Sequence, residues 1–170
     1  VQHNTELLTT GFKLYQLEQV YNARGEQAFN DRKTNLINTL ADFYKNFNAS
    51  VDEKVFEQLI ELYANQPSKQ FLPKGLTNIN AKNLASEIYI KSKLKDYDSL
   101  KKLLSGDAKT VVANLNADPA FILVKELSDK YNKEIAPKYD EINLEITALQ
   151  RTYMKAQLEL NTDSRIFPDA

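Results

Sequence analysis

The chain has 170 residues, 42% of them hydrophobic, and carries 22 Lys and Arg against 23 Asp and Glu. This length and apolar content suffice for one domain with a real core, whereas the balanced charge leaves no electrostatic footprint for nucleic acid or an anionic membrane. Cysteine is absent, which excludes disulfides, thiolate metal sites and a cysteine nucleophile. With only four Gly and five Pro, the composition favours helix throughout.

No apolar run approaches the roughly 20 residues that a membrane-spanning helix needs, so we expect no membrane insertion. The first residues, VQHN, have neither the basic nor the apolar region of a secretory signal. If the protein is exported, its signal lies upstream of this segment.

The first predicted element covers residues 5–47. Its apolar residues recur at helical spacing, and Gly25 predicts a break or kink near residues 22–25. The members of this seam are Leu8, Phe12, Tyr15, Phe29, Leu36, Leu40, Phe43 and Phe47. Residues 1–5 lack a cap signature and are typical of a helix already under way.

A second helix is predicted to begin at a capping box formed by Ser50 and Glu53, and to end before Pro67. Its expected buried residues are Val55, Phe56, Leu59, Leu62 and Tyr63. The dozen residues that follow, 68–79, form a predicted loop whose apolar members suggest packing; they include Phe71, Leu72, Pro73, Gly75 and Leu76.

Three shorter helices follow in the prediction. The first covers residues 81–93 and presents Leu84, Ile88 and Tyr89. The second covers residues 98–104 and is terminated by Gly106, a residue that tolerates a left-handed conformation. The third covers residues 108–115 and is capped by Asp107.

The last stretch is the most regular. Asp118 and Pro119 mark a helix start, and apolar residues then recur in steps of four and three at Leu127, Tyr131, Ile135, Tyr139, Ile142, Ile146, Leu149, Tyr153, Ala156 and Leu160. A helix to residue 160 would be about 60 Å long, whereas a compact domain of this size is about 40 Å across. Either the protein is rod-like, or the chain was cut from something larger. Pro137 should kink this helix.

These patterns predict an all-α fold for residues 1–170: a single domain, an elongated helical bundle with two long helices, the C-terminal one kinked, and several short ones. A starting point within a helix and an end at FPDA without a stop signal suggest an excised part of a larger protein.

Side chains that could carry chemistry are few. His3 is the only histidine, and no orienting carboxylate or nucleophile accompanies it in the sequence. Glu57 with Glu61, and Glu141 with Glu145, resemble half of a carboxylate di-metal site, but the Glu-x-x-His motifs that complete such a site are missing, so a solvated helix face is the favoured interpretation.

Lysines 91, 93, 95, 101 and 102, interleaved with Tyr89 and Tyr97, resemble a small polyanion patch. Asp96 and Asp98 interrupt it, and the balanced charge argues against nucleic-acid binding. No Gly-rich phosphate loop, Gly-x-Ser-x-Gly elbow or zinc motif is present. The sequence therefore predicts no catalytic, cofactor-binding or metal-binding residue, no cofactor and no nucleic-acid partner.

Several segments nevertheless resemble a known family. Residues 149–156, LQRTYMKA, followed by residues 167–170, FPDA, are similar to the end of the helical domain in bacterial serine dipeptidyl-peptidases of the dipeptidyl-peptidase 7 and 11 family. Residues 28–32, AFNDR, residues 118–121, DPAF, and residues 136–137, AP, with Tyr139, occur in the expected order. The similarity covers most of the chain and is most specific in its last twenty or so residues.

The resemblance implies a bipartite enzyme. In that family a chymotrypsin-like double β-barrel carries a His-Asp-Ser triad, and a helical insertion covers the cleft so that only N-terminal dipeptides are released. This chain resembles the later part of that insertion. The triad would then lie outside residues 1–170, so no catalytic residue is assigned, the segment alone is expected to be inactive, and peptides would be bound through the parent's barrel.

The resemblance also implies a periplasmic, cell-surface or secreted protein. Within it, Phe71 and Leu72 are hypothesised to dock on a surface outside this chain, which requires that both be exposed. The alternative function is a self-sufficient, non-enzymatic helical protein–protein interaction module, whose apolar seam pairs with another chain, a homodimer included. Substrate side-chain preference cannot be derived from the sequence.

Overall fold

The computed structural model describes residues 4–66 and 68–160, and every regular element among them is helical. The predicted all-α fold is confirmed. Contacts divide the chain into two units, Val1–Lys130 and Tyr131–Ala170, which are described separately; whether they act as the single predicted domain stays a prediction. Among the described residues, no helix has the length and apolar character required to cross a membrane.

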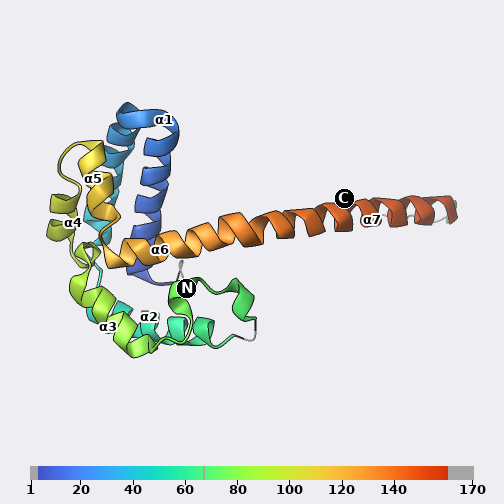
Figure 1. Ribbon diagram of the computed structural model, residues 1–170. Coiled ribbons are helices and arrows are strands. Elements are labelled where there is room, and N and C mark those ends of the chain that lie inside the picture. The colour runs from blue at the N-terminus through green and yellow to red at the C-terminus, as the bar shows by residue number, and fades with distance from the viewer. Residues whose placement is uncertain (1–3, 67, 161–170) are drawn as a thin grey trace. The chain divides into compact units, whose positions relative to one another are not determined.

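Helix α1, Glu6–Phe43, is two helices joined at Gly25. Gly25 has φ 78° and ψ −170°, a conformation almost restricted to glycine, and the chain turns back on itself there (Figure 1, dark to light blue). The rings of Tyr21 and Phe29 meet edge to face across the turn, 5.7 Å between centroids. Arg32 donates to Gln16, 3.5 Å away, so the two halves run antiparallel. The predicted break is confirmed, and it is a reversal.

Helix α2, Ala49–Ala64, corrects two predictions. Its N-cap is Asn48, whose side chain accepts from the backbone N–H groups of Ser50 and Val51, so Ser50 does not begin a capping box. Asn48 precedes Ser50 and places its own carbonyl oxygen on the first free donors. The buried face is also narrower than predicted, because Val55 is 40% and Leu62 71% exposed, whereas the face that packs inward consists of Asp52, Phe56 and Ile60.

The predicted packing loop contains two short 3₁₀ helices, η1, Lys69–Phe71, and η2, Lys74–Leu76. Leu72 and Leu76 are buried, whereas Phe71 is 37% exposed. The docking hypothesis is therefore wrong for Leu72, because this unit already covers it. Helix α3, Ala81–Lys91, packs against α2, and the ring centroids of Phe56 and Tyr89 lie 5.8 Å apart.

The next elements are η3, Lys93–Lys95, α4, Tyr97–Leu103, and α5, Ala108–Leu115. The predicted cap at Asp107 is confirmed, since its carboxylate accepts from the backbone N–H of Thr110 at 2.7 Å. Gly106, just before this cap, has the expected positive φ, 111°.

Helix α6, Pro119–Lys130, completes the core of the first unit by packing on α1. Phe121 and Val124 are fully buried. A Cβ added to Gly11 would lie 2.9 Å from Cγ2 of Val124, so a glycine at this position permits the close approach of α1 and α6. The predicted start of this helix at Asp118 and Pro119 is confirmed, because the Asp118 carboxylate accepts from the N–H of Ala120.

In the second unit, a π-helical stretch, η4, Tyr131–Ile135, leads into α7, Ala136–Leu160. The long C-terminal helical stretch is confirmed, and its α-helical hydrogen bonding is interrupted just ahead of Pro137, where the kink was predicted. Proline has no N–H to donate to the carbonyl of Lys133, and the π-helical turn lies where this bond is missing. No residue of α7 is buried.

Candidate functional site

The sequence candidates for chemistry are not brought together. His3 lies outside the described residues. Glu57 and Glu61 line a shallow polar cavity of about 280 Å³ at the end of α2, beside Lys82 at the start of α3. Glu141 and Glu145 are exposed on α7. Across residues 4–66 and 68–160, no group of three or more His, Cys, Asp or Glu side chains is placed to hold a metal ion.

Part of the predicted lysine patch does converge. Lys91 ends α3, Lys93 begins η3 and Lys102 lies on α4, and all three line one cavity of about 520 Å³. The remaining lining residues are Ser99, Leu103, Asn114, Ala117, Asp118 and Pro119. Three lysines that are up to eleven residues apart in the sequence thus share one concave surface of the first unit.

The other members of that patch point elsewhere. Lys95 donates to the backbone carbonyl of Ile90 at 2.8 Å. Tyr89 is 5% exposed and donates to Asp52. Tyr97 packs on Tyr44, with ring centroids 5.9 Å apart. The cavity is therefore lined by three of the five lysines of the patch, but not by the aromatic rings on which a nucleic-acid base would stack.

Asp118 forms one wall of the cavity and connects two elements. Its carboxylate accepts from the hydroxyl of Ser92 at 2.9 Å and from the backbone N–H of Lys93 at 2.7 Å. It also accepts from the N–H groups of Ala120 and Phe121, and so caps α6. Only 3% of Asp118 is exposed. Four donors and a helix N-terminus stabilise this buried charge without a lysine.

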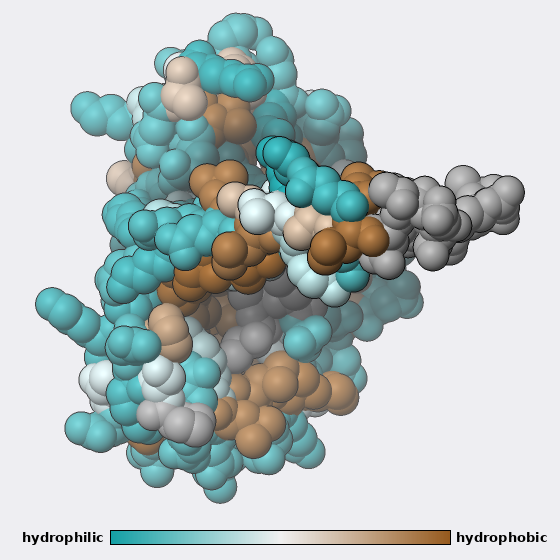
Figure 2. Space-filling model, turned by 90° about the vertical axis from the view of Figure 1, so that its right-hand side faces the viewer, coloured by the Kyte–Doolittle hydropathy of each residue, from teal (hydrophilic) through white to brown (hydrophobic). Residues whose placement is uncertain are grey.

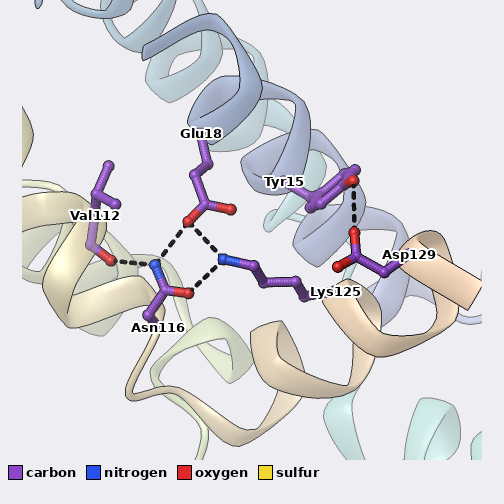
Figure 3. Close-up of polar contacts among 6 residues, drawn as sticks. All are labelled: Tyr15, Glu18, Val112, Asn116, Lys125 and Asp129. Atoms are coloured by element: carbon purple, nitrogen blue, oxygen red, sulfur yellow. Dashed lines mark hydrogen bonds and ion pairs between the residues drawn. The ribbon is translucent and has the colours of Figure 1, made fainter. Parts of the chain in front are cut away.

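A second charged cluster holds α1 against α5 and α6 (Figure 3). Glu18 on α1 accepts from Lys125 of α6 at 2.8 Å and from the amide of Asn116, just after α5, at 2.7 Å. Lys125 also donates to Asn116, and Tyr15 donates to Asp129 at 3.2 Å. The other oxygen of Glu18 is buried and has no partner among the described residues. This cluster is a structural clamp between helices.

A third buried carboxylate, Asp52, acts on a helix other than its own. It accepts from the N–H groups of Glu6 and Leu7, both at 2.8 Å, and so caps α1 from α2. Burial raises the pKa of Tyr89 far above its usual range, and the hydrogen bond to Asp52 and nearby carboxylates raise this pKa further.

Sequence reasoning missed Glu18 and Asp52. A signal was present for Asp52, because it shares a face with Phe56 and Ile60 at a spacing of four residues. A carboxylate on an apolar helix face requires a buried partner.

Apolar side chains also reach the surface. On α7 the exposed fractions are 62% for Tyr139, 55% for Ile142, 45% for Ile146 and 62% for Tyr153. Figure 2 shows hydrophobic patches among hydrophilic ones on one face of the molecule. The seam predicted from residue 127 is therefore buried at Leu127 and exposed at these four positions of α7.

Comparison with known proteins identifies the family. The model of the peptidase S46 family matches residues 1–170. An Asp/Glu-specific dipeptidyl-peptidase of Flavobacterium psychrophilum is 63% identical over 170 residues, which are 100% of this chain and 24% of that protein. An Asp/Glu-specific dipeptidyl-peptidase of Capnocytophaga gingivalis is 40% identical over 168 residues, 98% of this chain and 24% of that protein.

The chain thus spans about a quarter of the length of these curated relatives. A family match over the entire chain, together with 63% identity to a dipeptidyl-peptidase, agrees with the resemblance drawn from the sequence. This chain belongs to the peptidase S46 family.

Proposed function

We propose that this chain is the helical cap region of a serine-type dipeptidyl-peptidase, in which it covers the active-site cleft and helps to restrict cleavage to N-terminal dipeptides. The observation that carries the proposal is the 63% identity, over the entire chain, to a relative named as an Asp/Glu-specific dipeptidyl-peptidase. The name of the same relative supports a preference for peptide substrates that contain Asp or Glu. The segment alone performs no catalysis in this proposal, and peptides are bound through the rest of the protein.

The cap role agrees with the chemistry of the described residues. The three buried carboxylates Glu18, Asp52 and Asp118 accept from helix N–H groups, hydroxyls, an amide or a lysine within the first unit. They hold helices of the first unit together. A helical unit held together in this way suits a lid that excludes water and limits substrate length.

The experiment is hydrolysis of peptides by the full-length protein. We expect dipeptides to be released from a free N-terminus when the second residue is Asp or Glu, and not after N-acetylation, with products identified by mass spectrometry. A serine-directed covalent inhibitor should abolish the activity. Absence of hydrolysis from any free N-terminus would overturn the peptidase assignment.

The cap role has its own test. The double variant Ile142→Glu, Ile146→Glu introduces two charges into the exposed apolar seam of α7. If this seam packs on the rest of the full-length protein, the variant should weaken that packing and release peptides longer than dipeptides. The matched control, Glu141→Gln with Glu145→Gln, leaves the seam intact and should release dipeptides only. Dipeptides as the only product of the seam variant, at an unchanged rate, would contradict a cap that seats through α7.

A second candidate function, a helical protein–protein interaction module that includes homodimers, is favoured by the exposed apolar residues of α7. It predicts that the same seam variant dissociates a complex in sedimentation velocity while the wild-type protein hydrolyses nothing. We propose a periplasmic, cell-surface or secreted location, which fractionation of cells with an antibody to the protein would test.

A further inference from the structure

The lysine cavity of the first unit has the size of a ligand site. Its volume of about 520 Å³ falls within the range of small-molecule and side-chain pockets. The end of α3, the start of η3, α4, the end of α5 and the start of α6 all contribute to its wall. A wall built from five elements is fixed by the packing of the unit, and a site on such a wall is held in shape before a ligand arrives.

The charge inside this cavity is positive and is not neutralised by its own wall. The ammonium groups of Lys93 and Lys102 make no hydrogen bond or ion pair with the residues that the structure describes, whereas Lys91 is paired with Glu87 at 2.6 Å. Asp118 is the one carboxylate of the lining, and its oxygens are occupied by four other donors.

One further carboxylate, that of Asp96, lies outside the cavity lining and interacts electrostatically with Lys102. Burial acts to raise the pKa of Asp96, but hydrogen bonds from Ser99 and the charges of Lys95 and Lys102 lower it overall. Asp96 also receives the backbone N–H of Ser99 at 2.8 Å, as the cap of α4. The carboxylate that interacts with Lys102 therefore already caps a helix, and the carboxylate nearest to Lys93 in the lining, that of Asp118, is bound by backbone N–H groups and a hydroxyl and not by the Lys93 ammonium.

The shape and chemistry of the cavity favour a carboxylate carried on a peptide. Leu103, Ala117 and Pro119 offer apolar contacts for side-chain methylenes, and Asn114 offers an amide at an exposed position. Inorganic phosphate fits less well, because the helix N-terminus at Pro119 is already occupied by Asp118 and no arginine lines the cavity. Nucleic acid lacks an aromatic platform here.

We propose that this cavity binds an acidic side chain of the peptide substrate, with Lys93 and Lys102 as the two principal cations. The inference rests on the proposed function for the identity of the ligand as a peptide. In this proposal the helical region helps to bind acidic substrates, in addition to covering the active-site cleft.

The experiment measures binding of N-acetylated Glu-Glu-Glu amide to the full-length protein by isothermal titration calorimetry, with the Gln-Gln-Gln peptide as the uncharged comparison. In the double variant Lys93→Gln, Lys102→Gln we expect affinity for the acidic peptide to fall by about tenfold or more. Lys93→Arg with Lys102→Arg keeps both charges and should retain most of the affinity. The matched control, Lys54→Gln with Lys101→Gln, removes the same charge from outside the cavity and should change affinity less than about twofold.

Equal losses of affinity in the cavity variant and in the control variant would contradict the proposed site. Equal affinity of the wild type for the Glu and Gln peptides would contradict it as well. Full displacement of the peptide by inorganic phosphate at the same concentration would overturn its selectivity for peptide carboxylates. Unchanged unfolding midpoints show that each variant is folded. Binding does not require cleavage, so a wild type that binds the acidic peptide but hydrolyses nothing contradicts the proposed function and leaves the anion site standing.

Discussion

The hydroxyl of Tyr89 donates to Oδ2 of Asp52 at 2.6 Å, although the two residues lie on different helices and are 37 positions apart. The same carboxylate caps α1 through the N–H of Leu7. One buried charge therefore connects three helices of the first unit. Loss of either partner leaves a polar group without a partner in the core, and this is the costly case for a buried hydrogen bond.

We expect Tyr89→Phe to lower the free energy of unfolding by about 1 to 3 kcal/mol, because Asp52 keeps its charge and loses a donor. Asp52→Ala should cost at least as much, since α1 then loses its cap. Urea unfolding of the full-length protein measures both. Tyr63→Phe is the matched control, because it removes a more exposed bond, to the carbonyl of Phe71, and should cost less than about 1 kcal/mol.

Lys125→Met should destabilise the protein by about 1 to 3 kcal/mol, because the buried Glu18 then keeps only Asn116 as a donor. The cost of breaking this pair is smaller than for a fully buried pair, because the lysine side chain is 35% exposed and solvent screens its charge. The comparison is Lys45→Met, which breaks an exposed pair with Asp42 and should leave the unfolding midpoint almost unchanged. Equal effects of the two substitutions would contradict a clamp at Glu18.

Gly25→Ala should lower the free energy of unfolding by about 1 to 3 kcal/mol. Apart from Gly25 itself, its two chain neighbours and the adjacent helix backbone, no heavy atom that the structure describes lies within 4 Å of the position that a Cβ would take. The cost would therefore arise from the backbone conformation and not from a clash. Gln19→Ala, at an exposed helical position of the same hairpin, is the control and should be nearly neutral. A neutral Gly25→Ala would show that the chain can turn here in another way.

Stability should fall as the pH rises above about 10. Burial is the main cause that raises the pKa of Tyr44 and of Tyr89 above the usual value, so both stay protonated in the folded state while they ionise in the unfolded state. The unfolded state then binds fewer protons, and its stability relative to the folded state increases with pH. Urea midpoints between pH 8 and 11 test this, and a double Tyr44→Phe, Tyr89→Phe variant should show a shallower decline. An equal decline in that variant would assign the effect to other groups.

Local sequence signals predicted the elements well where the partners are close along the chain. Asp107 and Asp118 cap helices through N–H groups two or three residues away, and the break at Gly25 depends on that one residue. Asn48 was missed because Ser50 and Glu53 also match a cap pattern, and only the geometry decides between them. The broad apolar face of α2 could not show which half is buried, since that depends on where α3 packs.

The sites depended on contacts that no local pattern reveals. Glu18 and Lys125 are 107 positions apart, and Tyr15 and Asp129 are 114 apart. The lysine patch was visible as a cluster of charge, but the sequence could not separate Lys93 and Lys102, which line a cavity, from Lys95, which bonds to a backbone carbonyl. Family resemblance supplied what local physics could not, because the proposed chemistry requires residues outside this chain.

The reversal at Gly25 also bears on the order in which the chain folds. The pairs that connect its two arms, Tyr21 with Phe29 and Gln16 with Arg32, are separated by 8 and 16 positions, so closing them costs little chain entropy. The pairs that connect α1 to α6 are separated by more than 100 positions. The hairpin can therefore form early and offer a ready surface, on which α6 docks late to complete the core.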